Sequence, residues 1–152
     1  MTASLRRSLG YDDVEEGEEL PALVIPITRT LIVSAALASR DYQDVHHDAQ
    51  LARERGSQDI FMNILTTNGL VGRFVTDWTG PGGILREVAI RLGAPNYPGD
   101  SMTLTGAVDE KLGPEPEGGR GRVRVAVRGS NRLGDHVTGT VTVSLPAEGI
   151  RQ

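Results

Sequence analysis

The sequence contains no cysteine, which excludes disulfide bonds, thiolate metal ligands and cysteine nucleophiles. It also has no apolar run near the ~20 residues that a membrane-spanning helix needs. Its first residues, MTASLRRSLGYDD, lack the apolar stretch of a secretory signal. Positive charge is scarce, because 16 Lys and Arg stand against 20 Asp and Glu, and this gives no general attraction for nucleic acid or an anionic membrane. We therefore expect a cytoplasmic protein that binds neither.

The composition is typical of one globular domain. Hydrophobic residues make up 38% and charged residues 24% of the 152 residues, and a chain of this length can bury a self-sufficient core. We expect a flexible N-terminal arm over residues 1–10, one domain over residues 11–146 and a C-terminal tail over residues 147–152.

The first half of the chain predicts a strand followed by helices. Residues 20–27 are apolar with a proline near each end, which suits an edge strand. Thr28 or Thr30 can cap a helix that ends near residue 38, and Asp48 can cap a second helix over residues 49–55, which Gly56 would end. Residues 60–78 form a long apolar segment that predicts a buried central helix.

Two glycines lie inside that apolar segment, Gly69 and Gly72. Each costs about 1 kcal/mol of helix stability relative to alanine, so a small residue must be needed at each position. We expect close packing of the helix on a sheet as the reason.

The second half of the chain alternates apolar and polar residues, as strands with one buried face do. Four such segments follow one another, and residues 113–121 form a Gly- and Pro-rich turn between the second and the third; the four cover residues 84–92, 101–108, 122–128 and 137–145. Consecutive antiparallel strands after one buried helix predict an α+β protein, a single hot-dog fold in which an antiparallel sheet wraps around the long helix.

Titratable residues concentrate in the loop SRDYQDVHHD, residues 39–48, which holds two of the three histidines and three aspartates. A metal site is disfavoured, because the side chains of the adjacent His46 and His47 diverge and a site needs three or four converging ligands. An acid–base pair of Asp41 and His46 is compatible with the spacing. Residues of these types in loops also serve as surface groups or helix caps, and Asp48 is explained as a cap.

The same segment resembles the signature of the MaoC-like (R)-specific enoyl-CoA hydratases, S-G-D-x-N-P-[IL]-H-x-D, with Asp41, His46 and Asp48 at the matching intervals. GYDDVEEGEELP, PGDSMTL and NRLGDHVTGTVTVSL resemble other parts of that family, so the resemblance covers roughly residues 10–146. Within the family it is nearest to the small subunit of the heteromeric hydratases of actinobacterial steroid (cholesterol) side-chain degradation. Gln43 and Asp44 depart from the pattern, and IFMNIL stands where members have a His-Gly pair.

The resemblance implies hydration of a 2-enoyl-CoA thioester, a hydro-lyase reaction, with Asp41 and His46 as the catalytic pair. It implies that backbone N–H groups at the start of the central helix hold the thioester oxygen, and Asn63 and Ile64 are the nearest candidates here. Coenzyme A would be part of the substrate, with no separate cofactor and no metal. A bulky steroid acyl group and a second hot-dog subunit in a heteromer, with a heterotetramer or otherwise a homodimer as the assembly, are further expectations.

Two alternative functions remain open from the sequence. A hot-dog acyl-CoA thioesterase would hydrolyse the same kind of thioester, and a non-catalytic subunit would only complete the substrate tunnel of a partner. We expect His47 to be a surface residue and His136 to be structural. Basic side chains that could meet the coenzyme A phosphates include Arg86, Arg91, Arg122 and Arg124, and the sequence does not choose among them.

Overall fold

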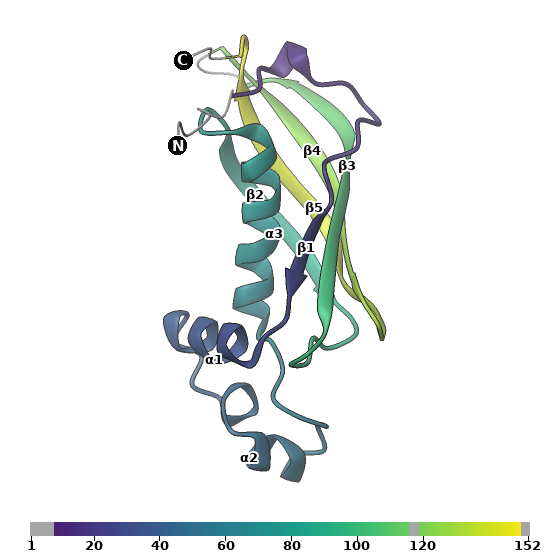
Figure 1. The fold of residues 1–152 in the computed structure, drawn as a ribbon. Helices are drawn as coiled ribbons and strands as arrows, with labels where there is room; N and C mark the ends of the chain where they lie inside the picture. The colour runs from purple at the N-terminus through teal and green to yellow at the C-terminus, as the bar shows by residue number, and fades with distance from the viewer. Residues whose placement is uncertain (1–7, 116–118, 150–152) are drawn as a thin grey trace, which may run out of the picture.

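A computed structural model of the chain describes residues 8–115 and 119–149. A five-stranded antiparallel sheet in the order β1-β3-β4-β5-β2 curves around the helix α3, and α1 and α2 form a lobe at one end (Figure 1). The sheet wraps one long helix, so the predicted α+β hot-dog fold is confirmed. The elements in chain order are η1 (Tyr11–Asp13), β1 (Leu23–Pro26), α1 (Arg29–Ala38), η2 (Asp44–His46), α2 (Ala49–Glu54), α3 (Ile64–Thr79), β2 (Ile84–Leu92), β3 (Ser101–Pro114), β4 (Arg120–Asn131) and β5 (Gly134–Pro146).

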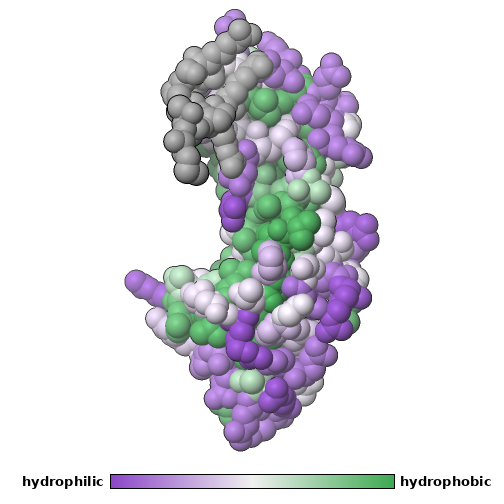
Figure 2. Space-filling view, in the orientation of Figure 1, coloured by the Kyte–Doolittle hydropathy of each residue, from purple (hydrophilic) through white to green (hydrophobic). Residues whose placement is uncertain are grey.

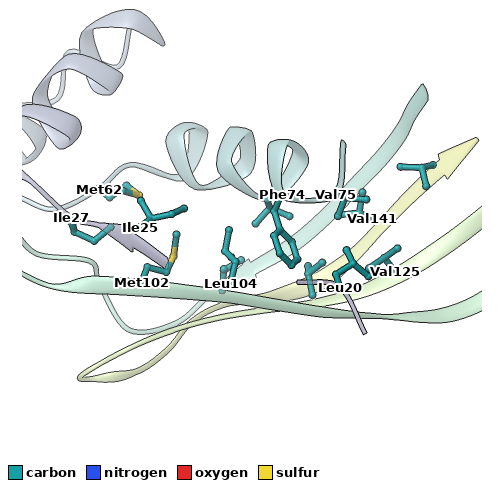
Figure 3. Close-up of a cluster of buried hydrophobic side chains, with 14 of the residues drawn as sticks. Leu20, Ile25, Ile27, Met62, Phe74, Val75, Met102, Leu104, Val125 and Val141 are labelled. Carbon is teal, nitrogen blue, oxygen red and sulfur yellow. The ribbon is translucent and has the colours of Figure 1, made fainter. Parts of the chain in front are cut away.

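The core lies between α3 and the inner face of the sheet, as Figure 3 shows. The helix contributes Phe74 and Val75, and the alternation of β4 places Val123, Val125 and Val127 on the same inner face. Burying each such side chain stabilises the fold by about 1.5–3 kcal/mol. This core fixes α3 against the sheet, and therefore also fixes the position of its N-terminal end.

The helix boundaries follow local capping. The Thr28 hydroxyl accepts the N–H of Leu31 at 3.0 Å, and Asp48 accepts the N–H groups of Gln50 and Leu51 at 2.9 and 3.0 Å. Both predicted caps are confirmed. The long helix begins at Ile64 instead of residue 60, because the Asn63 side chain caps it.

The two glycines of α3 have different surroundings. A Cβ at Gly72 would lie 3.3 Å from the Leu85 side chain of β2, so close packing on the sheet is confirmed there. A Cβ at Gly69 would meet nothing within 4 Å, and Gly69 is exposed. The predicted sheet contact is therefore wrong for Gly69, which is exposed to solvent.

β3, β4 and β5 are longer than their sequence pattern predicted, the bounds of β2 agree, and β1 is shorter than the predicted residues 20–27. In β2 the expected buried face is only half-formed: Val88 and Ile90 are partly buried, while Ile84, Leu85 and Leu92 are exposed by 36–42%. β2 is only partly buried because it lies at the edge of the sheet. An edge strand also presents one row of backbone groups without a strand partner.

The chain ends differ in part from expectation. Residues 1–7 of the predicted arm lie outside the described residues, whereas Ser8 is buried and its hydroxyl accepts the N–H of Gly82 at 2.8 Å. Residues 150–152 of the predicted tail and residues 116–118 of the predicted turn also lie outside them. β3 and β4 extend to Pro114 and from Arg120, which shortens that turn. Within the described residues, no helix has the length and apolar character needed to cross a bilayer.

Two consecutive helices end in the same hydrogen-bonded motif with different residues in its left-handed position. After α2, Gly56 has φ 89°, and after α1, Arg40 has φ 57°. In each case the N–H of this residue and that of the next one, Ser57 or Asp41, bond back to the last helical turn. Glycine adopts this conformation without a Cβ clash, whereas an L side chain pays on the order of 1 kcal/mol.

We predict opposite stability effects at these two positions. Arg40→Gly should raise the free energy of unfolding by up to about 1 kcal/mol, because relief of the clash exceeds the greater freedom of glycine in the unfolded chain. Gly56→Ala should lower it by about the same amount, although a Cβ there meets no atom within 4 Å. Urea unfolding of both variants measures this, and equal shifts of both midpoints in one direction would contradict it.

Candidate active site

The structure brings Asp41 and His46 together at one end of α3. Asp41 follows the turn that ends α1, and His46 is the last residue of η2. The Oδ2 atom of Asp41 and the Nε2 atom of His46 are 3.4 Å apart. Both line a pocket of about 330 Å³, which also includes Asn63 and Ile64 at the start of α3. Every residue predicted for the site is therefore present at this pocket.

His46 is held in one orientation and one tautomer. Its side chain is buried, and its Nδ1 lies 2.7 Å from the Phe61 carbonyl oxygen. A carbonyl only accepts hydrogen bonds, so Nδ1 carries the proton and donates. The Phe61 ring meets the imidazole edge-on, with 5.1 Å between ring centroids. In the neutral ring, Nε2 therefore presents a lone pair toward Asp41.

Asp41 is held by the side-chain amide of Asn63, whose Nδ2 donates to Oδ2 at 2.9 Å. This bond lowers the pKa of Asp41, burial opposes the shift, and the Gln43 N–H and, when it is protonated, the nearby His46 lower the pKa further. A carboxyl group with a lowered pKa is ionised at neutral pH. Its ionised form stabilises the fold at pH values above the ordinary carboxyl pKa, and this contribution is lost as the pH falls through the lowered pKa.

When the His46 ring is neutral, the pair presents two hydrogen-bond acceptors to the same space. A carboxylate oxygen and an imidazole lone pair cannot bond to each other without a shared proton. A water molecule can donate one hydrogen to each acceptor, and its oxygen then faces the pocket. This geometry is suited to holding and deprotonating one water molecule.

The start of α3 forms a second polar wall. The Asn63 Oδ1 accepts the N–H of Thr66 at 3.0 Å, which makes Asn63 the N-cap. The first N–H groups of a helix have no carbonyl within the helix, so that of Ile64 remains available for a ligand. The helix dipole favours negative charge at this end. Sequence reasoning placed Asn63 here for its backbone and missed its side-chain contact with Asp41.

The other titratable residues of the loop diverge from the pocket. The Nε2 atom of His47 lies 3.2 Å from the Tyr42 carbonyl oxygen at the surface, and Asp44 pairs with Arg55 at 2.7 Å. Among the described residues, no group of three or more metal-binding side chains is arranged around one point. His136, expected to be structural, lies in the pocket wall. No local sequence pattern predicts this position, because His136 is far along the chain from the loop of residues 39–48.

The four arginines considered for coenzyme A phosphates differ in their contacts. Arg86 forms an ion pair with Glu115 at 3.0 Å, and Arg124 pairs with Asp109 at 2.9 Å. Arg91 and Arg122 are exposed. The geometry does not select one of them as a phosphate ligand.

We predict that Asn63→Ser raises the pKa of Asp41, because the amide that contributes most to its lowering is removed. A serine still caps the helix, whereas Asn63→Ala should also cost about 1 kcal/mol of stability. In both variants, the loss of activity on the acid side of the pH profile should therefore occur at a higher pH. An acid limb that stays in place in both would show that the amide does not set the ionisation of Asp41.

Comparisons with known proteins agree with this fold. No protein-family model matches the chain. It is 48% identical over 129 residues to the 3-oxo-4,17-pregnadiene-20-carboxyl-CoA hydratase beta subunit of Mycobacterium tuberculosis, which covers 85% of this chain and 95% of that protein.

Two solved structures extend the comparison. A chain of the ChsH1-ChsH2 complex from Mycobacterium tuberculosis matches with a TM-score of 0.77 and 47% identity, over 86% of this chain and 98% of that one. The unliganded R-hydratase PhaJ1 from Pseudomonas aeruginosa matches with a TM-score of 0.81 and 25% identity, over 95% and 90%. These likenesses place the protein among the hot-dog proteins. Its similarity to the curated relative over most of both chains shows the family: the chain belongs to the MaoC-like (R)-hydratases.

Proposed function

We propose that this protein adds water to the double bond of a 2-enoyl-CoA thioester, with Asp41 and His46 as the catalytic pair. The observation that carries the proposal is the 3.4 Å approach of Asp41 Oδ2 and His46 Nε2 beside the N-terminal end of α3. The hydratase names of the relative and of PhaJ1 support the reaction class.

The proposed reaction uses one bound water. The pair takes a proton from this water as its oxygen bonds to the β-carbon, and electrons move through the conjugated system to the thioester oxygen. The N–H groups at the start of α3, with Asn63 and Ile64 as the proposed donors, stabilise the resulting enolate. The pair then returns a proton to the α-carbon on the same face, so that the product gains one hydroxyl and one hydrogen.

We propose a bulky, steroid-derived acyl group as the substrate. The relative is named for a pregnadiene carboxyl-CoA substrate, which is a steroid thioester. The pocket beside the catalytic pair has apolar walls from Phe61, Met62, Ile64, Leu92 and Pro95, which suit a hydrocarbon skeleton.

We also propose that a second hot-dog subunit completes the site, since a chain similar to this one occurs in a two-component complex. The surface that would receive it is the α3–β2 face, which we define as Ile64, Leu65, Gly69, Ile84 and Leu85. Its large side chains are 39–51% exposed, and β2 is an edge strand that another sheet could extend. Figure 2 shows hydrophobic surface at mid-height, around α3 and β1 as placed in Figure 1, between more polar ends.

The test is an assay of purified chain, alone and with a co-expressed hot-dog partner, on a steroid enoyl-CoA and on a short-chain enoyl-CoA. Loss of absorbance of the conjugated double bond measures hydration, and we expect it with the partner present. Release of free thiol without hydration would indicate a thioesterase. Hydration that survives both Asp41→Asn and His46→Ala would indicate a subunit without a catalytic role.

A further inference from the structure

A buried polar network links the pocket wall to Asp41 through the first turn of α3. His136 of β5 is 2% exposed and Thr67 of α3 is fully buried. The Thr67 hydroxyl lies 2.8 Å from His136 Nε2, and His136 Nδ1 lies 2.7 Å from the Ala94 carbonyl oxygen. Thr67 also donates its backbone N–H to the Asn63 carbonyl oxygen at 3.2 Å. Asn63 in turn holds Asp41.

The hydrogen-bond roles in this network are fixed by its end at Ala94. Because the Ala94 carbonyl only accepts, Nδ1 of His136 is the donor, and Nε2 accepts the Thr67 O–H. Burial lowers the pKa of His136, with the Ala94 bond opposing the shift, so the ring is neutral at physiological pH. Both ring nitrogens are occupied, so His136 does not compete with His46 as the acid or base.

Residues 93–96, the loop that contains Ala94, are also hydrogen-bonded to the chain just before α3. The Met62 N–H donates to the Asn96 carbonyl oxygen at 3.1 Å, and the fully buried Asn96 accepts from Asn131 at 2.8 Å. Residues 93–96 are therefore joined both to the residue before the N-cap and, through His136, to the turn after it. The two attachments lie on either side of Asn63.

We infer that His136 and Thr67 are positioning residues for the proposed hydration: they hold the first turn of α3 so that the Asn63 amide stays on Asp41. The inference rests on the proposed function. A hydroxyl and an imidazole that are fully buried are costly to retain unless their bonds are satisfied, and removing one partner leaves the other unpaired. A small displacement of the helix start would move the carboxylate and the enolate-binding N–H groups together.

The test compares Thr67→Val, which keeps the shape and removes the hydroxyl, with Thr67→Ser, which keeps the hydroxyl. In the complex with the partner, Thr67→Val should lower kcat about 10- to 100-fold with a smaller change in KM, and the acid limb of its pH profile should move to higher pH. Thr67→Ser should keep both kcat and the acid limb close to those of the wild-type protein. His46 is the ionisable group in contact with Asp41, so a titration of the Asp41 carboxyl, which needs no activity, is also recorded in a His46→Gln background.

A measurement that needs no activity separates this inference from the proposed function. Carbon-13 NMR titration of the Asp41 carboxyl in the folded chain should show a raised pKa in Thr67→Val and in His136→Gln, and an unchanged pKa in Thr67→Ser. If the unchanged protein shows no hydration but the titration behaves in this way, the proposed function fails and the positioning role stands. An unmoved Asp41 titration in both folded variants, with kcat retained, overturns the inference.

Discussion

Replacing Asp41 with asparagine is expected to reduce kcat for enoyl-CoA hydration about 10³-fold, at the level typical of a lost general acid–base group. Asparagine fills the same space and can still contact Asn63, but it cannot take a proton from water. His46→Gln should have a similar effect, because glutamine can still bond to the Phe61 carbonyl while its amide does not accept a proton at neutral pH. Absorbance of the conjugated double bond measures the rate in both variants.

The adjacent residue provides a matched control for this prediction. His47→Gln should leave kcat within about twofold, because His47 faces the Tyr42 carbonyl outside the pocket. Surface substitutions away from a functional site or the core have small effects. Thermal unfolding of all three variants checks that the folds are equal. Comparable losses in the His46 and His47 variants would contradict the assignment, as would an Asp41→Asn protein with a nearly normal rate.

The sequence predicted those features that depend on neighbouring residues. Thr28 and Asp48 cap helices through atoms two or three residues away, and the alternation of β4 is repeated along one strand. A pattern of this kind is complete within a short window of sequence. The position of the α3 start was less accurate, because Ile60 and Met62 are as buried as residues of a central helix although they lie before it.

The contacts that organise the site join distant residues, and no local pattern contains them. Asn63 reaches Asp41 across 22 positions, and Thr67 reaches His136 across 69. The pairing of Asp41 with His46 was suggested by a five-residue spacing and by the family resemblance. Its support from Asn63 requires the fold, because α1 and α3 must first pack against each other. The wall formed by His136 requires β5 to lie beside α3.

Gly69 is a helical glycine that no contact within its own chain explains. The sequence indicated that something requires a small residue there, and the expected neighbour was the sheet of the same chain. The structure places Gly72 against that sheet and leaves Gly69 in solvent. Leu65, Gly69 and Gly72 follow one another at helical spacing, so Gly69 lies between an exposed leucine and the contact of Gly72 with β2. A glycine that weakens its helix without an internal contact is explained if another chain approaches the helix backbone at this point.

Gly69→Leu is therefore expected to separate folding from assembly. In the isolated chain the new side chain meets no atom at its Cβ, and leucine favours the helix by close to 1 kcal/mol relative to glycine. The urea midpoint should stay the same or rise. With the partner present, the side chain would occupy the space proposed for the second subunit, so the mass of the complex and the hydration activity should be lost together. Gln50→Leu, on the exposed side of α2 away from the α3–β2 face, should change neither. A Gly69→Leu chain that assembles as the unchanged protein does would place the partner on another surface.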